Sequence, residues 1–305
     1  WAIDDLAAAL ELRGAVVADA RAVVPPLKRA CRPHVLFTTF RCPPCTPLRR
    51  RIEDNTRHVW SSMDRVEFRV VTAADVDFPR GLPVVRDMDA RMIEACPNAS
   101  AYTYANGDII GTHDFVETVD AVSRVEVGWN FLMVGRRTDV PWSEAEAYDA
   151  TEEGFDFIGH YIDRGRLFVP YAEDYFTVTR DAINWTGVPP FVVGRPGYDI
   201  WLVDHAHHKH GVAVVDATKT VPMIHQTDEN GNFSWGGGIG DKASLNYNFK
   251  FASRKHADHG LTDHADFETH RDRENGYVHI RRKRRNVVAG TTRRKHMFRD
   301  FKGRT

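Results

Sequence analysis

Short runs of apolar residues, each followed by polar residues, recur along the first 216 positions of the chain. They are rich in β-branched and aromatic side chains and have the length of buried strands. The predicted strands lie at 34–40, 66–71, 101–105, 130–136, 175–180, 191–194 and 212–216.

Between most of these runs, apolar residues recur every three or four positions, which predicts helices that bury one face. The predicted helices lie at 4–13, 46–63, 84–96, 112–123, 143–162 and 198–209. Strands that alternate with helices favour an α/β sandwich with a mostly parallel central sheet.

A change in composition near Asp228 indicates how the chain divides, because Gly, Asn, His and charged residues predominate beyond it. We predict ordered loops over 228–260 that close a site, followed by a mobile remainder. The expected domains are a helical extension at 1–33, a main domain at 34–250, and a His-rich and basic tail at 251–305.

The overall composition excludes two classes of protein. The 305 residues are 42% hydrophobic and 11% aromatic, so the chain can bury a core and is not disordered throughout. No run of about 18 apolar residues is present, so no membrane span is expected, and no secretory signal is visible. The chain opens at Trp1 rather than Met, so we expect an upstream segment to have been removed.

Charge is distributed unevenly between the body and the end of the chain. Residues 281–305 hold 11 Lys and Arg against one acid, Asp300, whereas the whole chain has a formal charge of −1. One interpretation is a solvated C-terminal extension. The other is an arm that binds nucleic acid or another polyanion.

The four cysteines are Cys31, Cys42, Cys45 and Cys96. Cys42 and Cys45 have C-x-x-C spacing, but no second pair completes the four ligands of a structural zinc site. The two prolines between them do not favour a thioredoxin-like role. Ordinary thiols or a local disulfide are the favoured interpretation, zinc and redox catalysis are the alternatives, and the compartment stays undecided.

Polar residues with metal-binding chemistry follow the predicted strand at 101–105. Asn106, Gly107 and Asp108 come directly after it, and ligands of doubly wound sheets bind at the carboxyl ends of strands. A carboxylate there suits Mg²⁺ or Mn²⁺, which complete their shells with phosphate oxygens and water. The alternative is an ordinary Asn-Gly-Asp turn.

Further candidates follow other predicted strands. Arg136 and Arg137 end the strand at 130–136, where a diphosphate would need positive charge. Asp199 lies at a helix start and His225 follows a late apolar run. For Asp199 the alternative is a helix cap, and for Asp174, a second acid at a strand start, it is a loop acid.

Five segments, taken in order, resemble nucleotide-sugar-dependent glycosyltransferases of the GT-A type, especially a eukaryotic group with an Asn-x-Asp-Ile motif. They are Tyr102–Ile110, Phe131–Arg137, Asp174–Thr177, Pro190–Trp201 and Val214–Gln226. The resemblance covers roughly residues 34–250. It implies a GT-A Rossmann-like α/β/α sandwich that binds a nucleotide diphosphate sugar through Mn²⁺ or Mg²⁺, and hexosyltransferase-like activity.

The resemblance also implies roles for single residues. Asp108 matches the second acid of the Asp-x-Asp metal motif, and Asn106 stands where the first acid usually does. His225 matches a further ligand of the metal or diphosphate. Asp199 matches the general base of inverting members, and Asp174 is expected to bind sugar hydroxyls.

The loop after the first strand, with Thr38, Thr39 and Arg41, matches the loop that holds the nucleotide. Arg136, with Asp108 and His225, would serve the leaving diphosphate. The expected metal and diphosphate site requires Asp108 and His225 to lie close together in the folded chain.

The acceptor and compartment stay open at this point. A glycan, a protein or a small molecule could accept the sugar, in the Golgi lumen if a membrane anchor preceded Trp1, and in the cytoplasm or nucleus otherwise. Modified DNA, as in base J synthesis, is an alternative acceptor that the basic tail suggests. A catalytically silent binder of sugar nucleotides or polyanions is the alternative outside enzymes, and Asn106 favours it.

Two histidine-rich segments lack a zinc-enzyme pattern. They comprise Asp204–His210 and the later His256, His259, His264 and His270. We predict a solvated polar surface for both.

Overall fold

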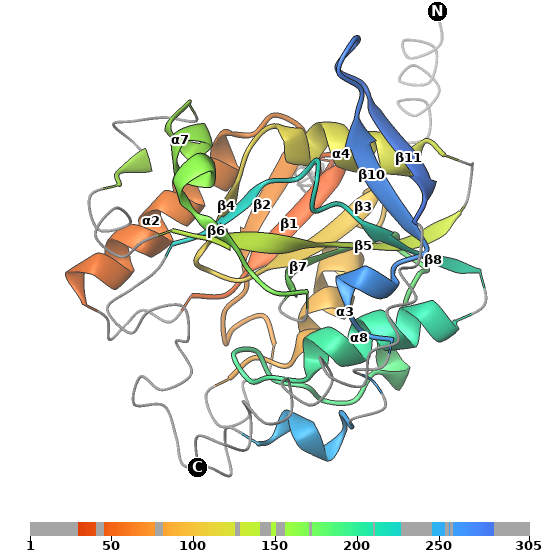
Figure 1. Ribbon diagram of the computed structural model, residues 1–305. Coiled ribbons are helices and arrows are strands. Elements are labelled where there is room, and N and C mark those ends of the chain that lie inside the picture. The colour runs from red at the N-terminus through yellow and green to blue at the C-terminus, as the bar shows by residue number, and fades with distance from the viewer. Residues whose placement is uncertain are drawn as a thin grey trace, which may run out of the picture. The chain divides into compact units, whose positions relative to one another are not determined.

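The chain divides into two compact units, Trp1–Ala30 and Cys31–Thr305, and the elements below all belong to the second. A computed structural model (Figure 1) describes residues 30–40, 46–76, 82–125, 129–140, 148–150, 156–170, 173–209, 211–226, 246–253, 256 and 259–283. The predicted helix at 4–13, Arg41, the Cys42–Cys45 pair and the basic residues after Lys283 lie outside this part.

The centre of the second unit is a large mixed sheet. Its main path has the order β11-β10-β8-β5-β7-β3-β1-β2. The bounds are β1 (His34–Thr38), β2 (Val66–Val70), β3 (Ala101–Ala105), β5 (Asn130–Asp139), β7 (Glu173–Val178), β8 (Val212–Asp216), β10 (Phe267–Arg271) and β11 (Val278–Arg282). Along this path β7 and β11 run antiparallel to their neighbours, and the other pairs are parallel. The sheet is therefore largely parallel, with two reversals.

Three short strands extend the sheet beside the carboxyl end of β5. They are β4 (Ile109–Gly111), β6 (Arg166–Leu167) and β9 (Met223–His225). β9 pairs in parallel with the last residues of β5 and antiparallel with β4, whereas β6 pairs with β5. This small extension brings chain segments from both halves of the unit together.

Five helices flank the sheet in the described part of the chain. They are α2 (Pro47–Ser62), α3 (Val85–Ala95), α4 (Asp114–Ser123), α7 (Asp156–Arg164) and α8 (Tyr198–His208). Figure 1 shows α3 and α8 on one face of the sheet and α2, α4 and α7 on the other. Each face has its own buried apolar cluster, so the predicted layered α/β arrangement is confirmed. None of the described helices is long and apolar enough to cross a membrane.

Helix α2 shows how local sequence signals set an element that supports the site. The hydroxyl of Thr46 accepts a hydrogen bond from the N–H of Arg49 at 3.2 Å, and Pro47 occupies the first turn. Trp60 lies on the buried face, and its indole N–H donates to the carbonyl of Ile109 at 2.9 Å. This bond fixes α2 against β4.

The predicted strand at 191–194 is wrong, because only an isolated bridge joins Val192 to Val84. The backbone of Val192 is satisfied by a side chain, since its N–H donates to Asn248 Oδ1 at 2.9 Å and its carbonyl accepts from Asn248 Nδ2 at 3.0 Å. Gly194 then turns the chain with a φ of 71°. Apolar residues here are buried by a loop rather than by strand pairing.

The sheet also continues beyond the expected domain end at residue 250. β10 pairs with Val215 and Asp216 of β8, and β11 adds the edge strand. Arg271 of β10 pairs with Glu117 of α4 at 2.8 Å. Strand pairing therefore orders Phe267–Arg282, which we had assigned to a mobile tail. The sequence analysis did not recognise these strands because few of their residues are apolar.

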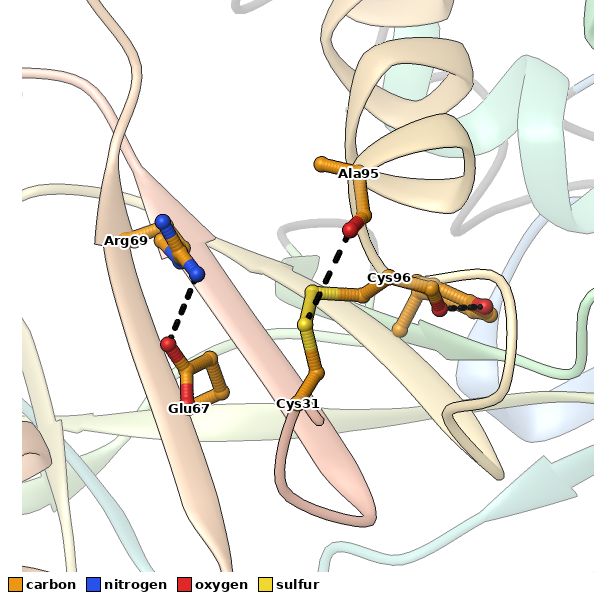
Figure 2. Close-up of a disulfide and its surroundings, with 6 residues drawn as sticks. Cys31, Glu67, Arg69, Ala95 and Cys96 are labelled. Atoms are coloured by element: carbon orange, nitrogen blue, oxygen red, sulfur yellow. Dashed lines mark hydrogen bonds and ion pairs between the residues drawn. A yellow bond between two sulfur atoms is a disulfide. The ribbon is translucent and has the colours of Figure 1, made fainter. Parts of the chain in front are cut away.

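A disulfide joins Cys31, just before β1, to Cys96 at the end of α3, as Figure 2 shows. Their Cα atoms lie 5.6 Å apart, although 65 positions separate the two residues along the chain. The sequence analysis considered a local pair at Cys42 and Cys45 and missed this long-range one. Pairing over such a separation depends on the parallel placement of β1 and β3, which brings the two segments together.

Candidate functional site

The carboxyl ends of β3 and β5 carry a buried cluster of charged and polar side chains. Because β7 runs antiparallel to both strands, its first residues also lie at this end. β9, which pairs with β4 and with the last residues of β5, adds His225. The members at the centre of the cluster are Asn106, Asp108, Arg137, Asp139, Asp174 and His225.

Asp108 and His225 meet, as the sequence analysis required. His225 Nε2 lies 3.6 Å from Asp108 Oδ2, although the residues are far apart in the chain. The antiparallel pairing of β4 with β9 explains this, because it sets Ile109 opposite His225. The N–H of Gln226 also donates to the carbonyl of Asp108 at 2.9 Å. Both side chains are at least nine-tenths buried.

Asp139 orients the other side of the same imidazole. His225 Nδ1 lies 3.2 Å from Asp139 Oδ1, so the ring is held between two carboxylates. Burial and the charge of Arg137 lower the pKa of His225, but Asp108 and Asp139 outweigh both, and the pKa lies above its ordinary value. A histidine in this setting keeps one nitrogen on Asp139 and presents the other to Asp108.

Arg137 links the histidine to a third carboxylate. Its Nε donates to Asp139 Oδ1 at 2.9 Å, and its Nη1 pairs with Asp174. The guanidinium also lies over the ring of Phe168, with 4.4 Å to the ring centre. Arg137 is 7% exposed, so its positive charge is buried and neutralises the buried acids of the cluster. We had expected it to face a diphosphate.

Asn106 holds Asp174 rather than reaching toward His225. Its Nδ2 donates to Asp174 Oδ1 at 2.6 Å, and its Oδ1 accepts from the hydroxyl of Tyr104 at 2.7 Å. An aspartate at this position would bring a second carboxylate against Asp174, where a donor is needed. Asparagine rather than aspartate at position 106 therefore has a structural reason.

Asp199 lies in the first turn of α8, and its Oδ1 accepts from the N–H groups of Gly197 at 3.1 Å and Ile200 at 2.9 Å. Removal from water raises the pKa of Asp199 to about 7, although these two hydrogen bonds oppose the change. The charge of Asp174 raises it further, so the two acids interact. Gly197 precedes the helix with a φ of 111°, a left-handed conformation that favours glycine.

Thr38 is the last residue of β1, and Thr39 follows it. Thr38 is fully buried, and its hydroxyl has no hydrogen-bond partner within the described part of the chain. A Cβ on Gly107 would lie 2.7 Å from the carbonyl of Thr39, so only glycine lets the turn after β3 pack so closely here. Arg41, the third residue predicted in this loop, lies outside the described residues.

Arg136 is separated from the cluster. Successive strand residues point to opposite faces, and Arg136 lines a different cavity, with Asp216 and Lys219. Its Nε donates to the carbonyl of Phe168. The two consecutive arginines, expected to act together on a diphosphate, therefore have different surroundings.

The sequence analysis missed several members of the site. Arg49 of α2 approaches Asp108 Oδ2 to 3.2 Å through its Nη1. Glu173 is buried beside the cluster, and its Oε1 accepts from the N–H of Thr262 at 3.1 Å. Burial raises the pKa of Glu173 well above its ordinary value, and the charge of Asp199 adds to this. For Arg49, the position on the predicted amphipathic helix was the one feature of the sequence that could have suggested a place near the site.

The histidine-rich segments come together, which was not expected. Rings of α8 pack on rings of the later segment, with 6.0 Å between the centres of His207 and His259 and 5.1 Å between those of His208 and His259. His205 stacks on Trp201 at 4.6 Å. Across the described residues, no group of three or more His, Cys, Asp or Glu has an arrangement that could hold a metal ion.

For a divalent cation, the cluster therefore offers two protein ligands, Asp108 and His225. Ligand atoms at about 2.1 Å from an ion and at right angles lie about 3 Å apart. The separation of 3.6 Å between Asp108 Oδ2 and His225 Nε2 is close to that value. Phosphate oxygens and water would have to supply the remaining ligands.

Comparison of the chain with protein-family models finds no match, and comparison with curated proteins finds none. The functional argument therefore depends on the geometry and chemistry of the cluster.

Proposed function

We propose that the chain is a GT-A glycosyltransferase, which transfers a sugar from a nucleotide diphosphate sugar to an acceptor hydroxyl with the help of Mn²⁺ or Mg²⁺. The observation that carries this proposal is the approach of His225 Nε2 to Asp108 Oδ2 at the carboxyl end of β3. Support for the GT-A assignment comes from the largely parallel sheet with helices on both faces and from the ordered segments that resemble this family.

Asp108 and His225 would hold the cation, and Asp139 would orient His225. A carboxylate that accepts from the second nitrogen of a ligand histidine fixes its ring and makes the free nitrogen a better donor to a metal. Mn²⁺ fits this pair better than Mg²⁺, because imidazole nitrogen is a softer ligand than oxygen. The bound ion would offset the negative charge that grows on the departing diphosphate.

Asp199 would act on the acceptor. A carboxyl group with a pKa of about 7 is partly ionised at neutral pH and can accept a proton from a hydroxyl as it attacks. Asp174, held by Asn106 and Arg137, lies close enough to affect that pKa and would bind sugar hydroxyls beside it.

A donor-hydrolysis assay tests this function. We expect release of free sugar from at least one nucleotide sugar in the presence of Mn²⁺, and loss of that release with EDTA. Asp108→Ala should abolish it and Asp199→Ala should reduce it by about 100-fold or more. Asp87→Ala is the matched control, because Asp87 is a partly exposed acid of α3, paired with Arg86 at 3.2 Å. Near-normal rates for both site variants would refute the assignment.

A catalytically silent binder is the second candidate, and the internal pairing of the cluster favours it. Arg49 and Arg137 already neutralise the acids, and Asn106 replaces a metal-binding acid. Tight binding of a nucleotide sugar without turnover, across a panel of donors screened by thermal shift with Mn²⁺, would support this candidate over the enzyme.

The disulfide bears on where the protein acts and on which acceptor it meets. Disulfides persist in oxidising compartments and are rare in the cytosol and nucleus. The Cys31–Cys96 bond therefore favours a secretory lumen, such as the Golgi, and an acceptor such as a glycan or protein. A modified-DNA acceptor is disfavoured by the same argument, and absence of salt-sensitive binding to duplex DNA would exclude it.

A further inference from the structure

A cavity of about 820 Å³ is lined by residues at or near the ends of β5, β8, β10 and β11. Five of its lining residues are basic, namely Arg136, Lys219, Arg281, Arg282 and Lys283. Three are acidic, namely Asp216, Asp263 and Glu268. The lining therefore has an excess of two positive charges, in a body that is otherwise acidic. Its volume is in the range of small-molecule sites.

Two of the three acids, Glu268 and Asp216, form ion pairs with cations of the lining and hold them in place. Glu268 accepts from Lys219 at 2.7 Å and from Arg281 Nε at 2.9 Å, so it holds two cations side by side. Asp216 pairs with Lys283 through Oδ2, and its Oδ1 accepts from the hydroxyl of Thr218 at 2.6 Å. Both carboxylates are thus occupied by hydrogen bonds from within the lining.

Donors remain on the cations after these bonds. An ammonium group has three N–H bonds and a guanidinium has five. Lys219 gives one of them to Glu268, and Arg281 gives its Nε and Nη2 to the same carboxylate. Their side chains are 57% and 55% exposed, so the remaining donors are open to a ligand. The side chain of Lys283 is only 14% exposed, and its ion pair with Asp216 lies in the more buried part of the cavity lining.

We propose that this cavity binds the phosphate group of a small-molecule phosphate monoester. A phosphate monoester carries close to two negative charges at neutral pH, which matches the excess in the lining. Its three oxygens accept charge-assisted hydrogen bonds from lysine and arginine, and cations already held in place lose little entropy on binding. The inference goes beyond the proposed glycosyl transfer and does not need it.

Isothermal titration calorimetry of the full chain, in low salt and with EDTA, tests the site. The probes are inorganic phosphate and glucose 6-phosphate, and EDTA removes any contribution from a cation at Asp108. Lys219→Ala and Arg281→Gln should each weaken binding about tenfold, and the double variant about 100-fold. Tighter binding of glucose 6-phosphate than of phosphate supports an ester as ligand, and equal affinity supports the phosphate group alone.

Arg69→Gln is the matched control, because Arg69 is also an exposed strand arginine paired with an acid. Its side chain is 47% exposed and pairs with Glu67 at 2.8 Å (Figure 2). Arg69 lies on β2, at the opposite edge of the sheet from β11. Its affinity for phosphate should equal that of the wild type, and melting curves of all variants should confirm that they fold.

Three outcomes would overturn the proposal. They are no heat of binding for either probe, equal affinity in the wild type and the double variant, and binding only to long polyanions such as duplex DNA. None depends on a nucleotide sugar, so a failure here leaves the glycosyltransferase assay unaffected.

Discussion

Removing the Cys31–Cys96 disulfide should destabilise the fold by an amount that follows from its position in the chain. The bond closes a loop with a sequence separation of 65. In the chain-entropy model, closing such a loop lowers the conformational entropy of the unfolded state by about 14 cal/mol/K. This stabilises the folded state by about 4 kcal/mol at 25 °C. Truncation to alanine also removes a buried sulfur at Cys96, which is 1% exposed. We therefore expect the Cys31→Ala/Cys96→Ala variant to lose about 3–5 kcal/mol of unfolding free energy.

Urea unfolding, followed by the fluorescence of the seven tryptophans, measures this loss. The m-value should rise as well, because an unfolded chain without the bond is less compact. Cys42→Ala/Cys45→Ala is the matched control. Even a bond between those two residues would close so short a loop that its removal should cost less than about 2 kcal/mol.

Two results would refute this reasoning. One is a loss below about 1 kcal/mol in the Cys31→Ala/Cys96→Ala variant. The other is a thiol titration of the denatured, unreduced wild type in which Cys31 and Cys96 both react. The first would mean that the bond does not constrain the unfolded chain. The second would mean that the bond is absent, and it would also remove the argument for an oxidising compartment.

The remaining predictions concern the cluster at the end of β3. Asp139→Asn should lower the pKa of His225, measured by NMR titration, and weaken Mn²⁺ binding about 10- to 100-fold; an unchanged histidine titration would contradict the geometry. Donor hydrolysis should rise with pH around a midpoint of about 7 as Asp199 ionises, and a flat profile would remove it as the base. Because the pKa of Asp199 is raised in the folded state, this group should make stability fall from about pH 4 toward pH 7, and the slope should be smaller in Asp199→Asn than in the wild type. Gly107→Ala should cost about 1–3 kcal/mol in urea unfolding, since its Cβ would meet the carbonyl of Thr39, whereas wild-type stability would contradict this contact.

Much of the sheet could be predicted from the chain alone because burial leaves a local pattern. β1, β3 and β8 appear as continuous apolar runs, and all five residues of β1 and of β3 are buried. A capping threonine, a proline in the first turn and apolar residues on one face all predict α2. These signals act within a few residues, so a single sequence contains them in full.

The strands that were missed lack such a pattern. β4 and β9 have three residues each, too short for a period to be recognised, and β11 is an exposed edge of mixed polarity. The apparent strand at 191–194 has the apolar residues but forms only an isolated bridge, and the side chain of Asn248 satisfies the backbone of Val192. Whether an apolar segment pairs depends on what lies beside it, which the local sequence does not contain.

For the candidate site, residue types were predictable and partnerships were not. The sequence by itself determined that carboxylates, an imidazole and arginines follow strand ends, and it indicated Asp108 and His225 as a pair. Only the tertiary structure decided that Arg137 of β5 pairs with Asp174 of β7 while Arg136 lines another cavity. It also decided that Cys31 joins Cys96. Each of these contacts joins segments brought together by strand order and by the reversal at β7, and sheet topology arises from packing the whole chain at once.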